Sequence, residues 1–151
     1  MTILAIDTSS EVLSLALLIK GRKIVETSSS SFVRHSEALA PEVEKFLKKQ
    51  KIKLQDIDGF AVGLGPGSFT GLRVGASFVK TLALALDKKI VGISSLEAIA
   101  GGVAGNDEKV AGVLDARKGN FYSAIYLRSK NELPLRAVHK PFIGTMPEIM
   151  E

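Results

Sequence analysis

The sequence predicts an α/β protein with one complete lobe and the beginning of a second, and three features support this. Three apolar strands follow one another at the N-terminus. A strand, a glycine-rich turn and a long apolar helix follow over residues 59–86. After a second glycine-rich break, residues 110–127 repeat the strand, aspartate turn and strand of the N-terminus. The predicted order is βββαβαβα and then three strands, with a first lobe at 1–104 and an incomplete second lobe of three strands at 105–151.

Composition restricts the chemistry that this chain can perform. Its 151 residues are 46% apolar with a net charge of +4, and a chain of this size buries ~70% of its unfolded surface. The absence of cysteine excludes disulfides and thiolate chemistry and fits a reducing cytosol. With two histidines far apart, a histidine zinc site is not expected, and an all-carboxylate site is the one metal option that remains. No run approaches the ~20 apolar residues of a membrane span, so we expect a cytoplasmic protein without membrane contact. The mild positive charge permits nucleic-acid contact without arguing for it.

The N-terminal strands are predicted at 3–6, 12–19 and 24–28, joined by short turns as an antiparallel meander. Because the first two are nearly all apolar, we expect them at the centre of a sheet covered on both faces. A helix is predicted over 36–50, with one apolar face, early glutamates and late lysines that match the helix dipole. Pro41 either starts this helix or kinks its first turn.

The glycine-rich turn over 63–73 joins the strand at 59–62 to the helix at 72–86. Glycines at 63, 65, 67 and 71 allow close backbone approach and aim N–H groups at a helix N-terminus, where anions bind. The residue pattern of this turn matches neither a P-loop nor a dinucleotide-binding fingerprint nor a nucleophile elbow. Two interpretations remain open, a phosphate cradle and a tightly packed turn without a ligand.

The helix at 72–86 has few polar residues, namely Arg73, Ser77, Lys80 and Thr81. A helix that is apolar nearly all round is buried on more than one side. One side faces its own sheet, and the other faces a helix of this chain or another protein. Because one other long helix accompanies it in this short chain, we expect a protein interface.

Later elements are predicted as a strand at 90–93, a short helix to about residue 104, and strands at 110–114, 121–127 and 135–139, with 141–151 as a loop. Asp7 and Asp115 each follow the first strand of a lobe. Two lobes that open with such hairpins are typical of the actin, hexokinase and sugar-kinase ATPases, where each hairpin faces a phosphate. The alternative for Asp7 is an ordinary turn or capping residue.

Five strings carry a resemblance to a known family over residues 1 to about 127. They are Ile3-Leu4-Ala5-Ile6-Asp7-Thr8-Ser9, His35-Ser36-Glu37, Gly65-Pro66-Gly67-Ser68-Phe69-Thr70-Gly71-Leu72-Arg73-Val74-Gly75, Ser94-Ser95-Leu96-Glu97 and Asp115-Ala116-Arg117. The chain resembles the bacterial TsaB (YeaZ) family, whose fold is the actin/hexokinase-like (ASKHA, ribonuclease-H-like) α/β lobe.

The resemblance implies a role in placing threonylcarbamoyl on adenosine 37 of tRNA (t6A). It implies a non-catalytic partner or activator of the catalytic protein TsaD, with TsaE as an ATPase partner, tRNA reached through the complex and a homodimer when alone. TsaD-type proteins carry a His-x-x-x-His metal pair where this chain has Ser95 and Ile99. A hydroxyl and a butyl group cannot replace imidazoles on a metal, so no catalytic residues, metal or cofactor of its own are expected, and ATP or ADP enters only within the complex. Family members usually continue for some tens of residues more.

Two sets of candidate residues follow. Partner-binding residues are expected on the two first-lobe helices: Leu39, Val43, Phe46, Val74, Phe78, Lys80, Thr81, Leu82 and Ala85. Candidate phosphate-binding residues are Asp7, Thr8, Ser9, Gly65, Gly67 and Ser68.

Two further functions compete with the partner role. One is a nucleotide-binding ATPase or kinase that uses Asp7, the Ser9 hydroxyl and the glycine loop. The other is a peptidase, which the missing cysteine, nucleophile elbow and histidine pair disfavour. For tRNA, Arg34, Arg73 and Arg117 are available, but the sequence has no basic stripe interleaved with aromatics. We therefore expect TsaD to carry most of the tRNA contact.

Overall fold

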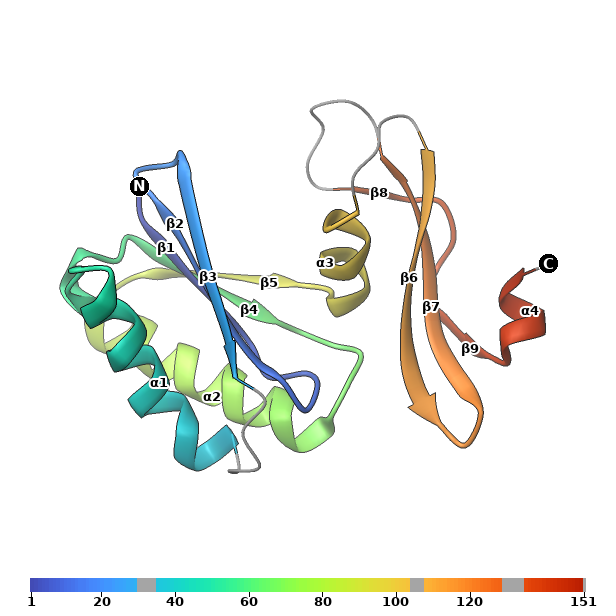
Figure 1. The fold of residues 1–151 in the computed structure, drawn as a ribbon, viewed down its shortest axis with the longest axis horizontal. Coiled ribbons are helices and arrows are strands. Elements are labelled where there is room, and N and C mark those ends of the chain that lie inside the picture. The colour runs from blue at the N-terminus through green and yellow to red at the C-terminus, as the bar shows by residue number, and fades with distance from the viewer. Residues whose placement is uncertain (30–34, 104–107, 129–134, 151) are drawn as a thin grey trace. The chain divides into compact units, whose positions relative to one another are not determined.

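A computed structural model describes residues 1–29, 35–103, 108–128 and 135–150. The chain divides into two compact units (Figure 1). The first unit holds residues 1–64 and 68–93, and the second unit holds residues 65–67 and 94–151. Each unit has its own hydrophobic core, so each is described by itself.

The first unit is a five-stranded sheet with the order β3-β2-β1-β4-β5. Strands β1, β2 and β3 form the predicted antiparallel meander, whereas β4 and β5 run parallel to β1. The strands are β1 Ile3–Asp7, β2 Leu13–Ile19, β3 Lys23–Ser29, β4 Gly59–Gly63 and β5 Lys89–Ile93. The helices are α1 His35–Lys49, the 3₁₀ turn η1 Leu54–Asp56 and α2 Phe69–Leu86. Helix α1 runs without a break through Pro41.

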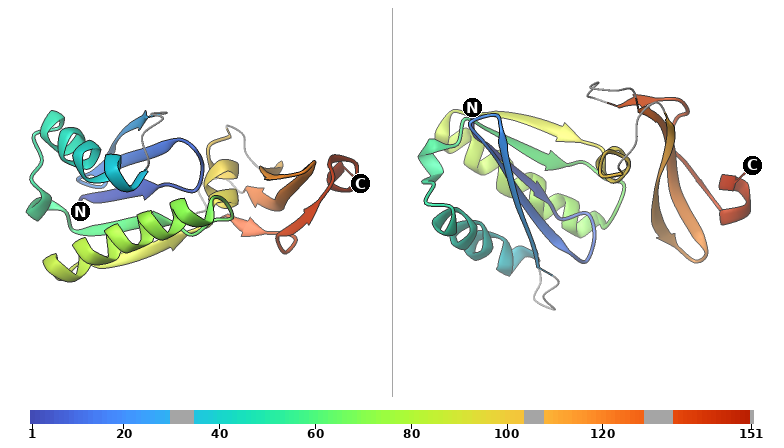
Figure 2. Two further views of the ribbon diagram at one scale, coloured as in Figure 1. Left: turned by 90° about the horizontal axis from the view of Figure 1, so that it is seen from below. Right: turned by 45° about the horizontal axis from the view of Figure 1, so that its top comes forward.

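Both long helices of the first unit pack on the same face of its sheet. Alternate strand residues such as Leu4, Leu17 and Phe60 are buried there, in one cluster with Phe46 of α1 and Val79 of α2. Figures 1 and 2 show α1 and α2 side by side against the strands. The intervening residues of β1 and β2 are half-buried. Strands β1 and β2 are therefore central as expected. One face of the sheet is covered by the two long helices, whereas the other face, which was also expected to be covered, is half-buried at β1 and β2.

Helix α2 begins three residues earlier than the sequence analysis expects, because Ser68 caps it. The Ser68 Oγ accepts a hydrogen bond from the Gly71 N–H at 3.2 Å, which satisfies one of the free donors of the first turn. The helix ends where Asp87 adopts a left-handed conformation and the Lys88 N–H bonds to the Ala83 carbonyl. Among the described residues, α2 is the one helix long and apolar enough to cross a membrane. The expectation that no run approaches that length was therefore too strong, although core helices of soluble proteins share this property.

The second unit is a four-stranded sheet with helix α3, Ser95–Gly101, on one face and α4, Met146–Met150, after its last strand. Its strands are β6 Glu108–Arg117, β7 Asn120–Arg128, β8 Arg136–Ala137 and β9 Phe142–Gly144. Strand β7 pairs with all three others. Helix α3 lies so close to β6 that a Cβ on Gly112 would collide with the Leu96 carbonyl oxygen.

The order of the first eight helices and strands agrees with the sequence analysis, apart from the added 3₁₀ turn. The second unit differs in three respects. Contacts divide the chain after Ile93 rather than after residue 104, because α3 packs on β6 and β7. Its sheet has four strands rather than three, and residues 141–151 are not simply a loop, since they include β9 and α4. The expected lobe break at 105–107 lies outside the described residues.

Candidate partner-binding surface and glycine junction

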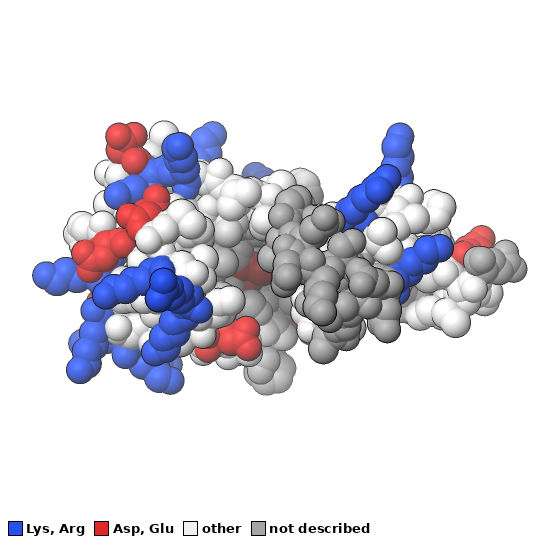
Figure 3. Space-filling model, turned by 90° about the horizontal axis from the view of Figure 1, so that it is seen from above, with Lys and Arg blue, Asp and Glu red and all other residues white. Residues whose placement is uncertain are grey.

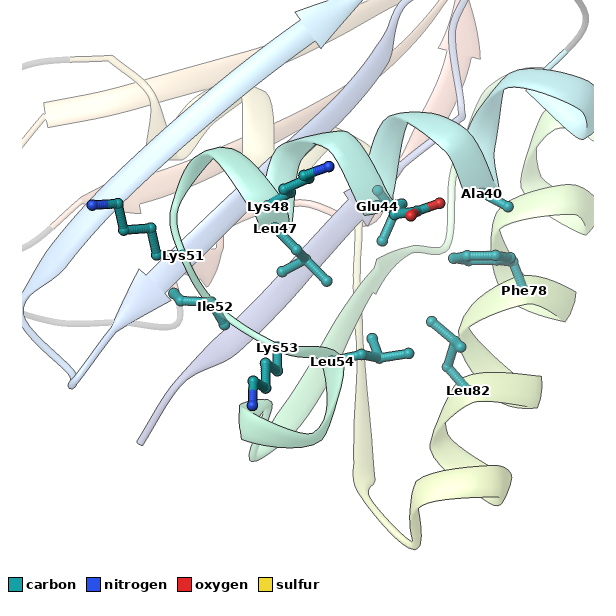
Figure 4. Close-up of a pocket in the computed structure, with 11 residues that line it drawn as sticks. Ala40, Glu44, Leu47, Lys48, Lys51, Ile52, Lys53, Leu54, Phe78 and Leu82 are labelled. Carbon is teal, nitrogen blue, oxygen red and sulfur yellow. The ribbon is translucent and has the colours of Figure 1, made fainter.

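An apolar groove lies on the surface of the first unit between α1, the segment that follows it, and α2. The groove has a volume of about 740 Å³, and Figure 4 shows Leu47, Leu54, Phe78 and Leu82 pointing into it. The first two come from α1 and η1, and the other two from α2. These side chains pack against the core below and remain partly exposed, apart from Leu47, which is buried.

A second hollow of about 360 Å³ continues along the same two helices. Ala40, Phe78 and Leu82 line both hollows, so the two form one surface that we call the α1/α2 groove. Ala40 is exposed on α1 and marks the middle of this surface. The remaining lining residues of the second hollow are Ser36, Leu39, Val74, Ser77 and Thr81.

Charged side chains border the apolar floor of the first hollow. Glu44, Lys48, Lys51 and Lys53 line it alongside the aliphatic residues, and all four are exposed. An apolar floor with a charged rim is the usual composition of a protein–protein interface.

Some of the predicted partner-binding residues line the groove, and others do not. Val74, Phe78, Thr81 and Leu82 line the groove. Leu39 and Val43 also line it, but they are 1% and 4% exposed and form its floor. Phe46 is 4% exposed, belongs to the core and lines neither hollow, so its side chain is removed from the candidate surface. Lys80 and Ala85 are exposed on α2 and line neither hollow.

Three groove residues, Ala40, Ile52 and Leu54, were not among the predicted partner-binding residues. The pattern Ile52-Lys53-Leu54, two apolar residues flanking a lysine after α1, was the available signal.

The end of β1 is tied to the start of α2 by short contacts around two glycines. The Thr8 hydroxyl donates a hydrogen bond to the Gly71 carbonyl oxygen at 2.7 Å, and Thr8 is 2% exposed. A Cβ on Gly71 would collide with the Thr8 carbonyl oxygen, and a Cβ on Gly75 would collide with the Thr8 Oγ1. The spacing Gly71-x-x-x-Gly75 thus places α2 directly against β1, which supports the packed-turn interpretation of these glycines.

The polar candidates near this junction already have partners within the chain. The Asp7 Oδ1 accepts a hydrogen bond from the Ser9 N–H at 2.7 Å, and the Asp7 carboxylate occupies the space where Gly63 has no side chain. The Ser68 N–H donates to the Ser9 carbonyl oxygen at 2.6 Å. Asp7, Thr8, Ser9 and Ser68 are therefore brought together, with Thr8 and Ser68 used for packing and capping.

Gly65 and Gly67 belong to the second unit. Gly65 has a φ of +93°, which a glycine adopts without strain, and its peptide bond to Pro66 is cis. The Gly65 carbonyl oxygen accepts a hydrogen bond from the Ser95 N–H at 2.8 Å.

Helix α3 carries Ser95 and Ile99, the two residues that the family resemblance places opposite the histidine pair of TsaD-type proteins. Ser95 is 3% exposed and Ile99 is 41% exposed, and neither is a metal ligand of the usual kinds. In the portion of the chain that is described, no three His, Cys, Asp or Glu residues are grouped so that they could hold a metal ion.

Comparisons with known proteins agree on the family. Residues 29–140 match the family described as TsaD: tRNA N6-adenosine threonylcarbamoyltransferase. The chain is 40% identical over 126 residues to the tRNA threonylcarbamoyladenosine biosynthesis protein TsaB of Bacillus subtilis, covering 83% of this chain and 55% of that protein. It is 36% identical over 153 residues to the TsaB of Escherichia coli, covering 95% of this chain and 64% of that protein. The chain thus spans between half and two thirds of the length of these relatives.

Solved structures resemble the chain in the same way. YeaZ from Pseudomonas aeruginosa superposes with a TM-score of 0.83 at 32% identity, covering 94% of this chain and 66% of the other. The ethanolamine utilization protein EutJ from Carboxydothermus hydrogenoformans has a TM-score of 0.51 at 16% identity, which supports the fold alone. The fold is the α/β lobe of the actin/hexokinase-like superfamily, as the sequence predicted. With the TsaD-type family match and the TsaB relatives, these findings establish that the chain belongs to the TsaB (YeaZ) family.

Proposed function

We propose that this chain is a non-catalytic partner of a TsaD-type catalytic subunit in the t6A modification of tRNA, and that the α1/α2 groove is where the two proteins meet. The groove is the observation that carries the proposal. It is an apolar surface on the two first-unit helices to which the family resemblance assigns the pairing.

The groove suits a helix of a partner protein. Its apolar residues come from α1, η1 and α2, so a partner side chain inserted between the helices would be surrounded on three sides. Each such side chain gains about 1.5–3 kcal/mol on leaving water. The flanking residues Glu44, Lys48, Lys51 and Lys53 would set the orientation of the partner rather than supply most of the affinity. This division between apolar floor and charged rim favours a specific protein partner over a small ligand.

A catalytic role of the chain alone has less support among the described residues. Ser95 and Ile99 offer no metal ligands, and the Thr8 and Ser68 hydroxyls are engaged in hydrogen bonds. We therefore assign no cofactor to this chain and place ATP or ADP, TsaE and tRNA in the wider complex. The nucleotide-binding alternative depends on Asp7, and calorimetry with ATP and magnesium would reveal it as micromolar binding by the isolated chain.

The proposed function is tested by t6A formation on an unmodified tRNA transcript. The assay contains threonine, bicarbonate, ATP, the enzyme that forms the threonylcarbamoyl intermediate, TsaD and TsaE, with or without this chain. We expect t6A to form faster in the reaction that contains the chain than in the reaction without it. An equal rate without the chain, or t6A formation by the chain without TsaD, would contradict the proposal.

A further inference from the structure

One end of the first unit gathers cationic side chains from three segments that are far apart in the sequence. We call this the basic end, and it lies where β1, β4 and β5 begin and β2 turns into β3. Its nine members are Lys20, Arg22, Lys23, Lys48, Lys49, Lys51, Lys53, Lys88 and Lys89.

The strand register places these segments along one edge. Lys23 of β3 pairs with Ile19 of β2, Ile3 of β1 pairs with Gly59 of β4, and Gly59 pairs with Lys89 of β5. Five strands at about 4.8 Å spacing extend over about 19 Å, which is roughly six base-pair steps of a duplex. The segment from the end of α1 to β4 brings the lysines at 48–53 to the same edge.

The charge at this end is unbalanced. It contains nine of the chain's 20 basic residues, whereas segments 20–23, 48–53 and 88–89 contain no carboxylate and the nearest ones along the chain include Asp56, Asp58 and Asp87. The Asp58 carboxylate lies 3.7 Å from the N-terminal ammonium, so it already has a cationic partner. Within the described ranges none of the nine cations forms a salt bridge, and all but the half-buried Lys88 are exposed. Figure 3 shows many lysine and arginine side chains on the first unit, with some acidic side chains among them.

We propose that the basic end binds the phosphate backbone of RNA, and its choice of RNA rests on the proposed role in tRNA modification. Lysines are flexible point charges, which suits phosphates that vary in position. Segments 20–23, 48–53 and 88–89 contain no aromatic residue, so the contact is to backbone charge rather than to stacked bases. Of the nine, Lys48, Lys51 and Lys53 also line the α1/α2 groove, so an RNA on the basic end would lie beside a partner in that groove.

The basic end contains none of the three arginines that the sequence offered for tRNA contact. Arg34 lies outside the described residues, the Arg73 guanidinium lies 5.5 Å from the Phe69 ring centre, and Arg117 belongs to the second unit. The sequence did not predict the basic end, because its residues come from three separate segments and no single segment forms a continuous row of basic residues.

The test measures the affinity of the full chain for a fluorescein-labelled, unmodified tRNA transcript by anisotropy between 50 and 200 mM salt. The first variant combines Arg22→Gln, Lys49→Gln and Lys89→Gln, which are exposed, come from three segments and lie outside the groove lining. The matched control combines Lys109→Gln, Lys118→Gln and Lys140→Gln in the second unit, with the same change in net charge.

We expect affinity for tRNA to fall with salt, because each phosphate contact releases about 0.7–0.9 counterions. The basic-end variant should bind about tenfold more weakly at 50 mM salt, with a slope smaller by about two to three. The control should keep the wild-type slope. Equal losses of tRNA affinity in the two variants would overturn the proposal. It would also be overturned if polyglutamate displaced the labelled tRNA as effectively as unlabelled tRNA does at equal charge, because the surface would then fit an acidic protein.

Light scattering with TsaD separates this proposal from the proposed function. The basic-end variant should bind TsaD as the wild type does, because its three residues do not line the groove. If the wild type does not bind TsaD, the proposed function fails while the anisotropy result still decides the RNA surface. If both variants bind TsaD normally and the complexes made with the basic-end variant and with the control bind tRNA with equal affinity, the RNA-binding proposal is contradicted and the proposed function is not.

Discussion

The Thr8 hydroxyl donates a 2.7 Å hydrogen bond to the carbonyl oxygen of Gly71, and this bond fastens the end of β1 to the first turn of α2. Thr8 is 2% exposed, so nearly all of the residue is shielded from water in the folded chain. The position of α2, and with it one wall of the α1/α2 groove, depends on this contact and on the two glycines that allow it.

Replacement of Thr8 by valine should destabilise the first unit. Valine keeps the shape of the side chain but removes the donor, so we expect a loss of about 0.5–1.5 kcal/mol in the free energy of unfolding. Urea unfolding followed by circular dichroism measures it. Thr27→Val on β3, where the threonine is half-buried and its side chain has no hydrogen bond to any described residue, is the matched control and should change stability by less than about 0.5 kcal/mol. Equal effects of the two substitutions would contradict the role of the hydrogen bond.

Gly75→Ala should destabilise the chain because its new methyl group collides with the Thr8 Oγ1. Overpacking of this kind costs about 1–3 kcal/mol, despite the higher helix propensity of alanine. If the collision is the cause, Gly75→Ala should cost less in a Thr8→Ala background, where the hydroxyl is gone. A double-mutant cycle measures this coupling, and strictly additive losses would show that the collision is not the cause.

Asp58 should titrate below its ordinary value. The backbone N–H of Thr2 donates to its carboxylate at 2.6 Å, and this bond, together with the N-terminal charge and Lys88, lowers the pKa of Asp58 below 3.8. A carboxyl whose pKa is lower in the folded state adds stability that is complete above its unfolded pKa and is lost as pH falls through the folded pKa. We therefore expect the wild type to lose more stability than Asp58→Asn as the pH falls below about 4. Thermal midpoints of both proteins from pH 6 to pH 3 test this, and parallel curves would contradict it.

The sequence predicted the first unit well because its signals are local. Apolar strands, the amphipathic pattern of α1 and the glycine turn each determine an element without help from distant residues. The C-terminal stretch shows a local signal that was overlooked. Thr145 and Glu148 form a capping pair, in which the Glu148 Oε2 accepts hydrogen bonds from the Thr145 N–H and Oγ1 at 2.7 and 2.8 Å, and α4 begins there instead of a loop.

The candidate surface was harder to predict because it depends on which apolar residues the core uses. Periodicity placed Leu39, Val43 and Phe46 on one face of α1, yet Phe46 is in the core while Ala40 lies in the middle of the groove. Neighbouring positions on a helix can line the groove or belong to the core, and the packing of the helix against the sheet determines which of the two occurs. The basic end could not be predicted from one segment, because strand pairing assembles it.

The α1/α2 groove is the proposed binding surface for the catalytic subunit, and Ala40→Arg is the variant that tests this surface alone. Ala40 is exposed and lines both hollows, so arginine would obstruct the groove without removing any core side chain. An exposed arginine four residues before Glu44 is also compatible with the helix. Ile24→Asp, at a 69% exposed apolar side chain on β3, is a control for the addition of surface charge.

Calorimetric titration of the chain with a TsaD-type protein is the most direct measurement. We predict binding by the wild type and by Ile24→Asp, and binding about 10²-fold weaker by Ala40→Arg, because a charge inserted into an apolar interface costs several kcal/mol. Circular dichroism of each variant confirms that it is folded. The absence of binding by the wild type, or wild-type affinity in folded Ala40→Arg, would contradict the claim.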